Sequence, residues 1–256
     1  MQGSDDIRMN DPEPDLSRYL EVARNATSCA VLTGAGVSAE SGMPTFRGED
    51  GLWKEYRAEE LATPEAFERN PNLVWEWYDY RRGIVEGVEP NAGHEALAQA
   101  EDLFEDFTLI TQNVDGLHQQ AGSRNVIELH GNIRRDRCNL CNRSRVEGEG
   151  RECDCGGPFR PDVVWFGEAL PAGAIEEAFR AVSTAELVFT AGTSTHVYPA
   201  AQLPYSAKEY GAFVVEVNPE PTPFTPLADL SVRGPSGVWL PILLDPSGIG
   251  SGSESG

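Results

Sequence analysis

Short apolar runs rich in β-branched residues recur along the chain and alternate with helical patterns. The runs have the length of buried strands and comprise Cys29–Thr33, Phe107–Thr111, Val126–Leu129, Leu187–Ala191 and Phe213–Val217. Between them, apolar residues recur at helical spacing, as in Leu16, Tyr19, Leu20 and Ala23 and again from Ala174 to Ala185. Regular alternation of strands and helices predicts an α/β fold built on an open parallel sheet.

One segment breaks this alternation. Residues 136–160 are polar and rich in glycine and carry four cysteines, which indicates a small inserted module. We expect one main domain over residues 15–245, preceded by a disordered N-terminus over residues 1–14. Residues 246–256, almost all Gly, Ser and Glu, are expected to form a flexible tail.

Composition places the chain among folded globular proteins. It has 256 residues, of which 40% are hydrophobic and 24% are charged, close to the averages for such proteins. No stretch approaches the roughly eighteen consecutive apolar residues of a membrane-spanning helix. The segment Met1–Asp15 is acidic and polar, unlike a signal peptide. We therefore expect a cytoplasmic protein that makes no membrane contact.

The charge balance narrows the kinds of partner. A formal net charge of -21 argues against direct binding to nucleic acid, because a polyanion would be repelled. A basic protein surface is the expected partner. The only lysines are Lys54 and Lys208, so arginine supplies nearly all of the 20 basic side chains. Dispersed acid of this kind suits a halophilic protein from a cell with very high internal salt.

A glycine-rich turn, Gly34-Ala35-Gly36, follows the first predicted strand. Glycines at a strand-to-helix turn let the backbone approach a diphosphate closely, so the position suits a dinucleotide. A third glycine at the usual spacing is missing, and Gly-x-Gly alone leaves open a tight turn that binds nothing.

A polar block, Gln112-Asn113-Val114-Asp115, follows the strand ending at Thr111. In a parallel sheet this is the edge where ligands bind. Amides and a carboxylate there can hydrogen-bond an amide ligand and ribose hydroxyls. The alternative is a polar loop whose side chains cap the next helix.

Histidine is the side chain best suited to accept a proton near neutral pH. His130 ends a predicted strand just before Gly131, which would open space beside its ring. A lone histidine is more often structural, however. The chain's other histidines, His94, His118 and His196, are weaker candidates and are assigned no catalytic role.

Four cysteines lie in two close pairs, Cys138 with Cys141 and Cys153 with Cys155. Two such pairs are typical of a tetrahedral structural zinc site. The segment between them is too polar to fold by hydrophobic burial alone, so the metal would supply its stability. A redox pair or free thiols form the alternative.

The string from Gly34 to Gly48 resembles the signature of the sirtuin family, whose members cleave NAD and pass an acyl group from lysine to the ADP-ribose. The resemblance runs from about Leu32 to Pro241. It implies a Rossmann-like sheet with an inserted zinc module, NAD as co-substrate, one structural zinc ion and acyl-lysine proteins or peptides as partners. The pair Cys153 and Cys155 departs from the family's Cys-x-x-Cys spacing and implies a tighter turn.

The resemblance also implies residue roles. His130 matches the catalytic base, while Asn113 and Asp115 match the residues that hold the nicotinamide carboxamide. The matching cofactor-binding residues are Gly34, Ala35, Gly36, Glu40, Thr45, Phe46, Arg47, Trp53, Gln112, Asn113, Val114, Asp115, Gly192, Thr193, Ser194, Asn218, Pro219, Glu220 and Ser236. The segment Pro161–Glu168 resembles the strand and loop that pair with the substrate peptide. Its matching peptide-binding residues are Val164, Phe166, Gly167 and Glu168.

Tyr78 and Arg81 lie three residues apart and would share one helix face. A phenol and a guanidinium suit the distal carboxylate of a succinyl, malonyl or glutaryl lysine. The pair resembles that of the class III sirtuins, the subgroup that removes acidic acyl groups, and Ala62 would leave room for the longer chain. Alternatively, Arg81 pairs with Glu76 or Glu86 on a surface helix and says nothing about substrate.

The resemblance therefore implies an NAD-dependent deacylase that removes succinyl, malonyl and acetyl groups from lysine and yields nicotinamide, O-acyl-ADP-ribose and free lysine. In the reaction that the resemblance implies, His130 acts as the base that deprotonates a ribose hydroxyl of NAD. A mono-ADP-ribosyltransferase, a plain deacetylase, a dehydrogenase and a non-enzymatic reader remain alternatives. The oligomeric state also remains open, with a monomer among the alternatives.

Overall fold

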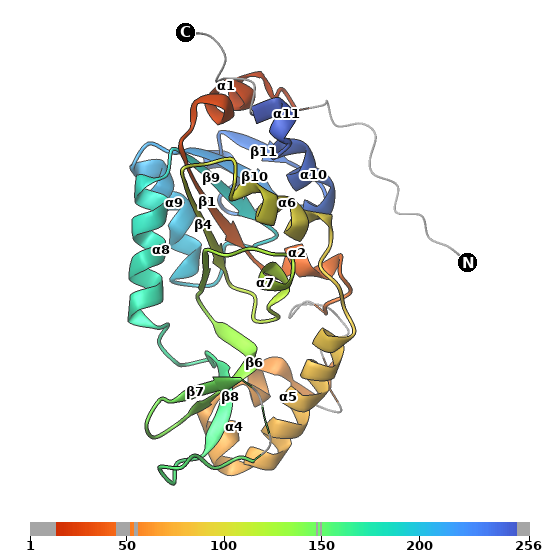
Figure 1. The fold of residues 1–256 in the computed structure, drawn as a ribbon, viewed down its shortest axis with the longest axis vertical. Coiled ribbons are helices and arrows are strands. Elements are labelled where there is room, and N and C mark those ends of the chain that lie inside the picture. Colours follow the sequence, from red (N-terminus) through yellow and green to blue (C-terminus); the bar gives the residue numbers. More distant parts are fainter. Residues whose placement is uncertain (1–13, 45–51, 54–55, 147, 149, 250–256) are drawn as a thin grey trace, which may run out of the picture.

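The computed structural model describes residues 14–44, 52–53, 56–146, 148 and 150–249. Its larger body is built on a six-stranded parallel sheet (Figure 1). The strands are β1 (Ser28–Thr33), β4 (Asp106–Thr111), β5 (Val126–Glu128), β9 (Leu187–Ala191), β10 (Phe213–Val217) and β11 (Leu230–Val232). Their spatial order is β11-β10-β9-β1-β4-β5. The five strands expected from the apolar runs are thus confirmed, and β11 is added.

The strand order reverses between β1 and β9. From β1 the chain moves outward through β4 and β5, then returns to β9 on the other side and moves outward again. This is the doubly wound arrangement of Rossmann-like folds, in which ligands bind at the carboxyl ends of the strands beside the reversal. The turns after β1 and β9 therefore occupy the expected ligand edge.

Helices cover both faces of this sheet because successive strand residues point to opposite sides. One face packs against α1 (Ser17–Asn25), α6 (Ala92–Ala100) and α10 (Ser236–Leu243). The other packs against α8 (Ala172–Thr184) and α9 (Leu203–Glu209). In Figure 1, α8 and α9 lie on one side of the strands, and α6 and α10 lie on the other. The helices expected around Leu16–Ala23 and over Ala174–Ala185 are α1 and α8.

The segment after Asp245 differs from the expected flexible tail at its start. Pro246–Ile249 form the short helix α11, and Ile249 is buried in the core beside α1. A single isoleucine in a Gly- and Ser-rich segment carries too little periodicity to predict this. Its burial depends on the apolar surface that α1 offers.

A smaller body lies below the sheet in Figure 1. It contains the antiparallel strands β6 (Gly131–Cys138), β7 (Ser144–Val146) and β8 (Phe159–Val163), in the order β7-β6-β8. Helices α4 (Pro64–Arg69) and α5 (Pro71–Glu86) pack on these strands. The expected module over residues 136–160 therefore starts inside β6 and ends inside β8. The sequence of β6 is mostly polar and has no apolar run to reveal it.

The remaining elements are short. They are α2 (Ala35–Ala39), β2 (Leu52–Trp53), β3 (Tyr56–Arg57), α3 (Ala58–Leu61), α7 (Leu117–Gln120), η1 (Ala200–Gln202) and η2 (Thr225–Leu227). Within the described parts of the chain, no helix has both the length and the apolar character needed to span a membrane.

Candidate active site

The turns after β1 and β9 touch at the ligand edge of the sheet. The Gly36 N–H donates to the Gly192 carbonyl oxygen at 2.9 Å, and the Gly34 N–H donates to Ala191 O at 3.1 Å. A Cβ on Gly36 would lie 2.7 Å from the Gly192 Cα, which is closer than side chains tolerate. Gly192 itself has φ +59°, a left-handed conformation that favours glycine. The glycines predicted to bind the cofactor therefore permit a close approach of two backbones.

The loop after β4 is tied to both turns. The Asn113 side-chain amide donates to Gly34 O at 3.0 Å and to Ser38 Oγ at 3.1 Å. The Gln112 amide donates to Thr193 Oγ1 at 2.9 Å. Three loops that are far apart in the sequence thus converge, and each contains residues predicted to bind NAD.

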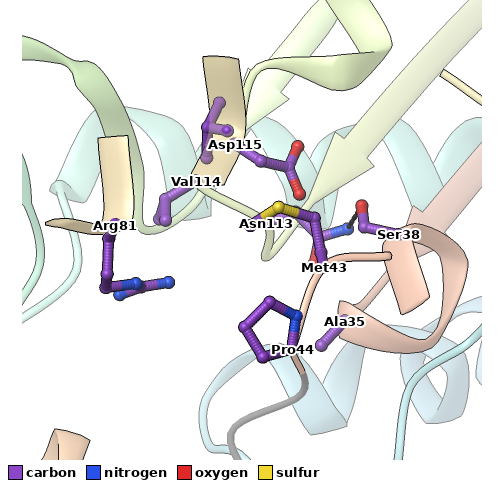
Figure 2. A pocket seen from close by; sticks show the side chains of 9 residues that line it. Ala35, Ser38, Met43, Pro44, Arg81, Asn113, Val114 and Asp115 are labelled. Carbon is purple, nitrogen blue, oxygen red and sulfur yellow. Dashed lines mark hydrogen bonds between the residues drawn. The ribbon is translucent and has the colours of Figure 1, made fainter. Parts of the chain in front are cut away.

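A pocket opens beside these loops (Figure 2). It is lined by Ala35, Ser38, Met43, Pro44, Arg81, Val85, Asn113, Val114 and Asp115. In Figure 2 the Asp115 carboxylate and the Arg81 guanidinium both extend toward the pocket from different elements. Asp115 Oδ1 also accepts the Leu117 N–H at 3.0 Å, so this residue caps α7 as well. The binding and capping interpretations of Asp115 are compatible.

His130 lies between the two bodies, where β5 leads into β6. Its Nδ1 lies 2.9 Å from the Gln112 carbonyl oxygen. A carbonyl oxygen can only accept, so Nδ1 carries the proton and Nε2 keeps its lone pair. Burial lowers the pKa of His130, partly offset by the bond to Gln112 O. The imidazole is therefore neutral at neutral pH and has a basic Nε2.

Gly131 follows His130 and is required by the strand contact rather than by the ring. It has φ +79°, and a Cβ there would lie 2.1 Å from the carbonyl oxygen of Asp162. Any side chain would separate β6 from β8. Close pairing of these strands fixes the backbone on which the His130 ring is carried.

The segment predicted to pair with a peptide, Pro161–Glu168, begins as strand and continues as a loop, because β8 ends at Val163. The Val164 N–H donates to His130 O, and the Phe166 N–H donates to Ala62 O, both at 2.9 Å. Phe166 is 49% exposed and Gly167 is exposed as well. The loop thus bridges His130 and the end of α3. Ala62, expected to border the acyl chain, is buried beside it.

The other predicted peptide-binding residue, Glu168, is directed into the protein. Its carboxylate accepts from the Arg160 guanidinium at 2.5 and 3.0 Å and from the Trp165 N–H at 2.8 Å. Through these hydrogen bonds the Glu168 carboxylate holds the loop at residues 164–168 together.

Tyr78 and Arg81 both lie on α5, as predicted, but they differ in environment. Arg81 lines the pocket, with its guanidinium carbon 5.1 Å from the Trp77 ring centroid. Burial lowers the pKa of Arg81, while the nearby Tyr78 and Asp115 favour its charged form. Tyr78 is completely buried, and its hydroxyl accepts from Trp165 Nε1 at 2.8 Å. Arg81 is therefore among the residues that line the pocket, whereas Tyr78 is buried beside Trp165.

The other residues predicted to bind the cofactor also come together in part. Glu40 Oε1 accepts from Ser236 Oγ and from the Gly237 N–H, both at 2.9 Å, which joins α2 to the start of α10. The Asn218 amide donates to Glu220 O at 2.8 Å within the loop after β10. The remaining predicted residues divide as follows: Pro219 is exposed, Ser194 is half-buried, Trp53 lies in β2, and Thr45, Phe46 and Arg47 lie outside the described residues.

The four cysteines form one cluster at the tip of the smaller body. Their sulfur atoms all lie within 4.8 Å of one another, with 3.5 Å between those of Cys138 and Cys155 and 3.7 Å between those of Cys141 and Cys153. Zinc–sulfur bonds of about 2.3 Å in a tetrahedron place sulfur atoms about 3.8 Å apart. The cluster therefore fits a zinc ion.

Glycine explains how the short Cys-x-Cys spacing is accommodated. A Cβ on Gly157 would lie 2.5 Å from the Leu140 Cβ and 2.9 Å from the Cys138 sulfur, so only glycine lets the second knuckle close on the first.

The N–H groups of Cys141 and Leu140 lower the pKa of Cys138 to about 6, against the effect of burial. One thiolate therefore forms readily, and a divalent cation would offset repulsion between further thiolates.

A model of the Sir2 family matches residues 34–199, more than half of the chain. The chain belongs to the Sir2 family. This confirms the resemblance to sirtuins, and the matched residues run from the first glycine of the turn to the loop after β9.

Curated relatives support membership of the Sir2 family over most of the chain. An NAD-dependent protein deacylase of Aquifex aeolicus is 54% identical over 221 residues, which cover 84% of this chain and 92% of that protein. An NAD-dependent protein deacylase of Thermococcus kodakarensis is 51% identical over 242 residues, which cover 90% of this chain and 94% of that protein.

Solved structures of Sir2 proteins share the fold. The crystal structure of a Sir2 homolog–NAD complex superposes with a TM-score of 0.83 at 48% identity, covering 89% of this chain and 91% of that one. A complex described as Sir2-p53 peptide-NAD+ superposes with a TM-score of 0.80 at 32% identity. The match covers 91% of this chain and 99% of that chain. The Rossmann-like α/β fold with a four-cysteine module is therefore confirmed.

Several pocket residues of this Sir2 protein were not predicted. Ser38 accepts a hydrogen bond from Asn113, and its hydroxyl lies 3.4 Å from His94 Nε2. Its position within the Gly34–Gly48 string, one helical turn after Gly34, was the available signal. Val85 gave no sequence signal, because the packing of α5 decides which of its residues line the pocket.

Proposed function

We propose that this Sir2 protein is an NAD-dependent protein-lysine deacylase. One observation carries the proposal: His130, with a basic Nε2, lies at the junction of the predicted NAD loops and the predicted peptide loop. Its ring is bonded to Gln112 in the former, and its carbonyl oxygen accepts from Val164 in the latter. A base held between two binding regions suits a transfer between two substrates.

NAD would lie along the carboxyl edge of the sheet. The closely packed glycine turns after β1 and β9 suit its diphosphate, which needs close backbone approach. The loop after β10 and the Glu40–Ser236 contact suit its adenosine. The nicotinamide end would enter the pocket of Figure 2, where the amide of Asn113 and the carboxylate of Asp115 can orient a carboxamide.

When bound, NAD supplies the ADP-ribose that accepts the acyl group and the nicotinamide that leaves. The residues of this chain do the positioning and the proton transfer. His130 Nε2 takes a proton from a ribose hydroxyl, because Nδ1 already donates to Gln112 O. Its neutral form, favoured by burial, is the form that can accept that proton.

The peptide would extend along the loop formed by residues 164–168. Phe166 and Gly167 are exposed there, and an extended peptide can lie along an exposed backbone segment with little sequence demand. The high negative charge of the chain favours basic protein segments as partners.

Zinc would be held by Cys138, Cys141, Cys153 and Cys155. Gly157, two residues after the last cysteine, lets the knuckles close. The cluster lies at the end of β6 and in the connections from β6 to β7 and from β7 to β8. None of its cysteines lines the pocket of Figure 2, so its expected role is structural.

We infer that acidic acyl groups, succinyl and malonyl, are substrates alongside acetyl. Arg81 supports this, because its guanidinium lines the same pocket as Asn113 and suits a terminal carboxylate. Burial of Tyr78 favours the competing candidate, a plain deacetylase, unless the phenol donates to an acyl chain that reaches it.

We also propose that the protein is adapted to high salt. Its formal net charge of -21 creates repulsion within the folded state, and salt screens such repulsion. The melting temperature should rise between low and molar KCl. A melting temperature that is independent of KCl would count against this adaptation.

The decisive experiment incubates the purified protein with NAD and matched acetyl-lysine, malonyl-lysine and succinyl-lysine peptides at low and molar KCl. Mass spectrometry follows nicotinamide and acyl-ADP-ribose. Acyl-ADP-ribose from any peptide supports the deacylase, and acidic acyl products support the role of Arg81. Nicotinamide release without an acyl peptide would indicate an ADP-ribosyltransferase instead. No NAD consumption under any condition would leave a non-enzymatic reader.

A further inference from the structure

A buried carboxylate lies near the carboxyl end of β10. Glu216 is 1% exposed, and its partners come from separate segments. One of its oxygens accepts from Thr225 Oγ1 at 2.6 Å, from Ser231 Oγ at 2.7 Å and from the Arg233 guanidinium at 3.1 Å. The other oxygen accepts from the Thr222 hydroxyl. One carboxylate therefore joins β10 to β11 and to the connection between these strands.

Arg233 links this carboxylate to the turn that follows β10. Its guanidinium also donates to Thr225 Oγ1 at 3.2 Å and to the Glu220 carbonyl oxygen at 3.4 Å. The same carbonyl oxygen accepts the Asn218 side-chain amide at 2.8 Å. The direction of the Asn218 amide therefore depends on where Arg233 holds Glu220.

The backbone of Arg233 leads into the turn before α10. Its carbonyl oxygen accepts from Trp239 Nε1 at 3.0 Å. Gly234 has φ +148°, and a Cβ there would lie 2.7 Å from the same nitrogen, so glycine lets the turn pass beside the indole. Two residues later Ser236 donates to Glu40 at 2.9 Å. Arg233 therefore lies between the two segments proposed to hold adenosine.

A buried ion pair at this place fixes direction as well as proximity. Apolar side chains pack without a preferred direction, so they would allow the two segments several relative positions. Hydrogen bonds between charged groups require a defined distance and angle. Because a buried carboxylate is costly unless its partners stay in place, Glu216 favours the one arrangement in which all of them reach it.

We propose that Glu216 and Arg233 are positioning residues for the adenosine end of NAD. Glu216 is buried and acts through its neighbours: the pair holds the turn at Asn218–Glu220 and the turn before Ser236 in the arrangement that accepts adenosine. Little reordering is then needed on binding, which favours affinity. The inference rests on the proposed deacylase function through its NAD site, and it is independent of which acyl group is removed.

Glu216→Gln and Arg233→Lys test the pair, singly and together. Glutamine keeps the size of the side chain and removes its charge, whereas lysine keeps the charge and loses the guanidinium fork. Titration calorimetry measures the Kd of ADP-ribose, which requires no turnover. Each single change should weaken binding by about tenfold, the effect of one hydrogen bond to a charged group. The double variant should also lose about tenfold, because both changes break the same pair.

Steady-state kinetics separate positioning from loss of structure. With NAD varied, each variant should show a KM for NAD raised about tenfold and a kcat near the wild-type value, the pattern of lost ground-state binding. The KM for the acyl-lysine peptide should not change at saturating NAD. A partly unfolded enzyme would instead lose kcat and keep its KM for NAD.

Glu186→Gln is the matched control. Glu186 directly precedes β9, at the amino ends of the strands, and its carboxylate accepts the Thr27 N–H at 2.6 Å and the Thr27 hydroxyl at 3.1 Å. This change also removes the charge of a hydrogen-bonded carboxylate, but at the edge of the sheet opposite the proposed NAD site. The Kd of ADP-ribose should stay at the wild-type value.

The outcomes separate positioning from the function beneath it. An unchanged Kd in both single variants would overturn the proposal, as would losses that multiply in the double variant or an equal loss in Glu186→Gln. If Glu216→Gln does not fold, Arg233→Lys decides alone. A wild type that binds ADP-ribose and forms no acyl-ADP-ribose would refute the deacylase and leave the positioning role standing. A wild type that binds no ADP-ribose would overturn both.

Discussion

The two bodies of the molecule are held together by different physics. In the larger body every residue of β9 and β10 is buried, and apolar side chains from helices cover both faces. In the smaller body charged side chains are buried, namely Arg82 of α5, Asp136 of β6 and Arg160 of β8, and a four-cysteine cluster is present. A large parallel sheet can stabilise itself by apolar burial, whereas a three-stranded sheet has too little surface to do so alone.

Buried charge in the smaller body joins separate elements. Asp136 in β6 is inaccessible to solvent and accepts from Arg82 of α5 at 2.8 Å and from Arg145 of β7 at 3.0 Å. Arg82 also donates to Ile133 O at 2.8 Å. One carboxylate therefore connects the helix that carries Arg81 to both strands beside the cysteines. The larger body has a counterpart in Glu216, which accepts from Arg233 at 3.1 Å. The other buried polar residues of its strands are uncharged, namely Thr33, Thr111 and Thr190.

Removal of zinc should produce the largest difference in stability between the two bodies. Binding free energies for structural zinc are about 10–16 kcal/mol, so a strong chelator should unfold the smaller body and leave the sheet largely folded. Hydrogen exchange should show loss of protection in β6, β7 and β8 before β1 and β9. Equal loss in both bodies would mean that they fold as one unit.

Cysteine variants identify the ligands in the same experiment. Elemental analysis should find about one zinc ion per chain in the wild type and clearly less in Cys141→Ser. Cys29→Ala is the matched control, because Cys29 is buried in the sheet core, away from the cluster, and should leave the zinc content unchanged.

Substitution of His130, which lies between the bodies, should separate chemistry from stability. His130→Ala should lower kcat by about 10²–10⁴-fold, the usual contribution of a general base, and the melting temperature should change little. His196→Ala is the control, since His196 is exposed in a loop and contributes no group to the proposed chemistry. Retained turnover in His130→Ala would assign the proton transfer to another residue.

Loss of one buried carboxylate should destabilise the smaller body. Asp136→Asn leaves two arginines without their charge partner and should cost about 3–5 kcal/mol of unfolding free energy, measured by urea denaturation. Asp102→Asn in the larger body is the control. Asp102 pairs with Arg124 at 2.6 Å, but the two side chains are 74% and 66% exposed, so a much smaller loss is expected because water screens the pair. Similar losses in both variants would contradict the difference between the bodies.

The smallest expected effect is a pH dependence in the larger body. Burial, assisted by the neighbouring His94, lowers the pKa of His118 to about 3, whereas an unfolded histidine titrates near 6.5. The folded state therefore binds fewer protons between these values, and stability falls as pH falls through this window, by at most about 1.4 kcal/mol per pH unit for this group. His118→Gln should flatten the slope of unfolding free energy between pH 7 and pH 5. An unchanged slope would mean that groups other than His118 cause the pH dependence of stability.

Features that depend on neighbouring residues in the chain could be predicted from the sequence. Apolar runs of strand length predict β1, β4, β5, β9 and β10 because a strand buried on both faces has few polar positions. Glycines mark the turns after β1 and β9, since close backbone approach excludes a Cβ. Paired cysteines predict the metal cluster because its ligands come from two short knuckles.

Features that depend on distant partners were decided only by the tertiary structure. Tyr78 and Arg81 share a helix face, yet the phenol is held by Trp165, 87 residues away, and only the guanidinium lines the pocket. Glu168 belongs to a substrate loop by its position but is directed inward by Arg160. Polar β6 and the short α11 have no local pattern that reveals them. The physical reason is that helix and strand periodicity record which residues are buried, whereas a buried polar group is explained only by the partner that satisfies it.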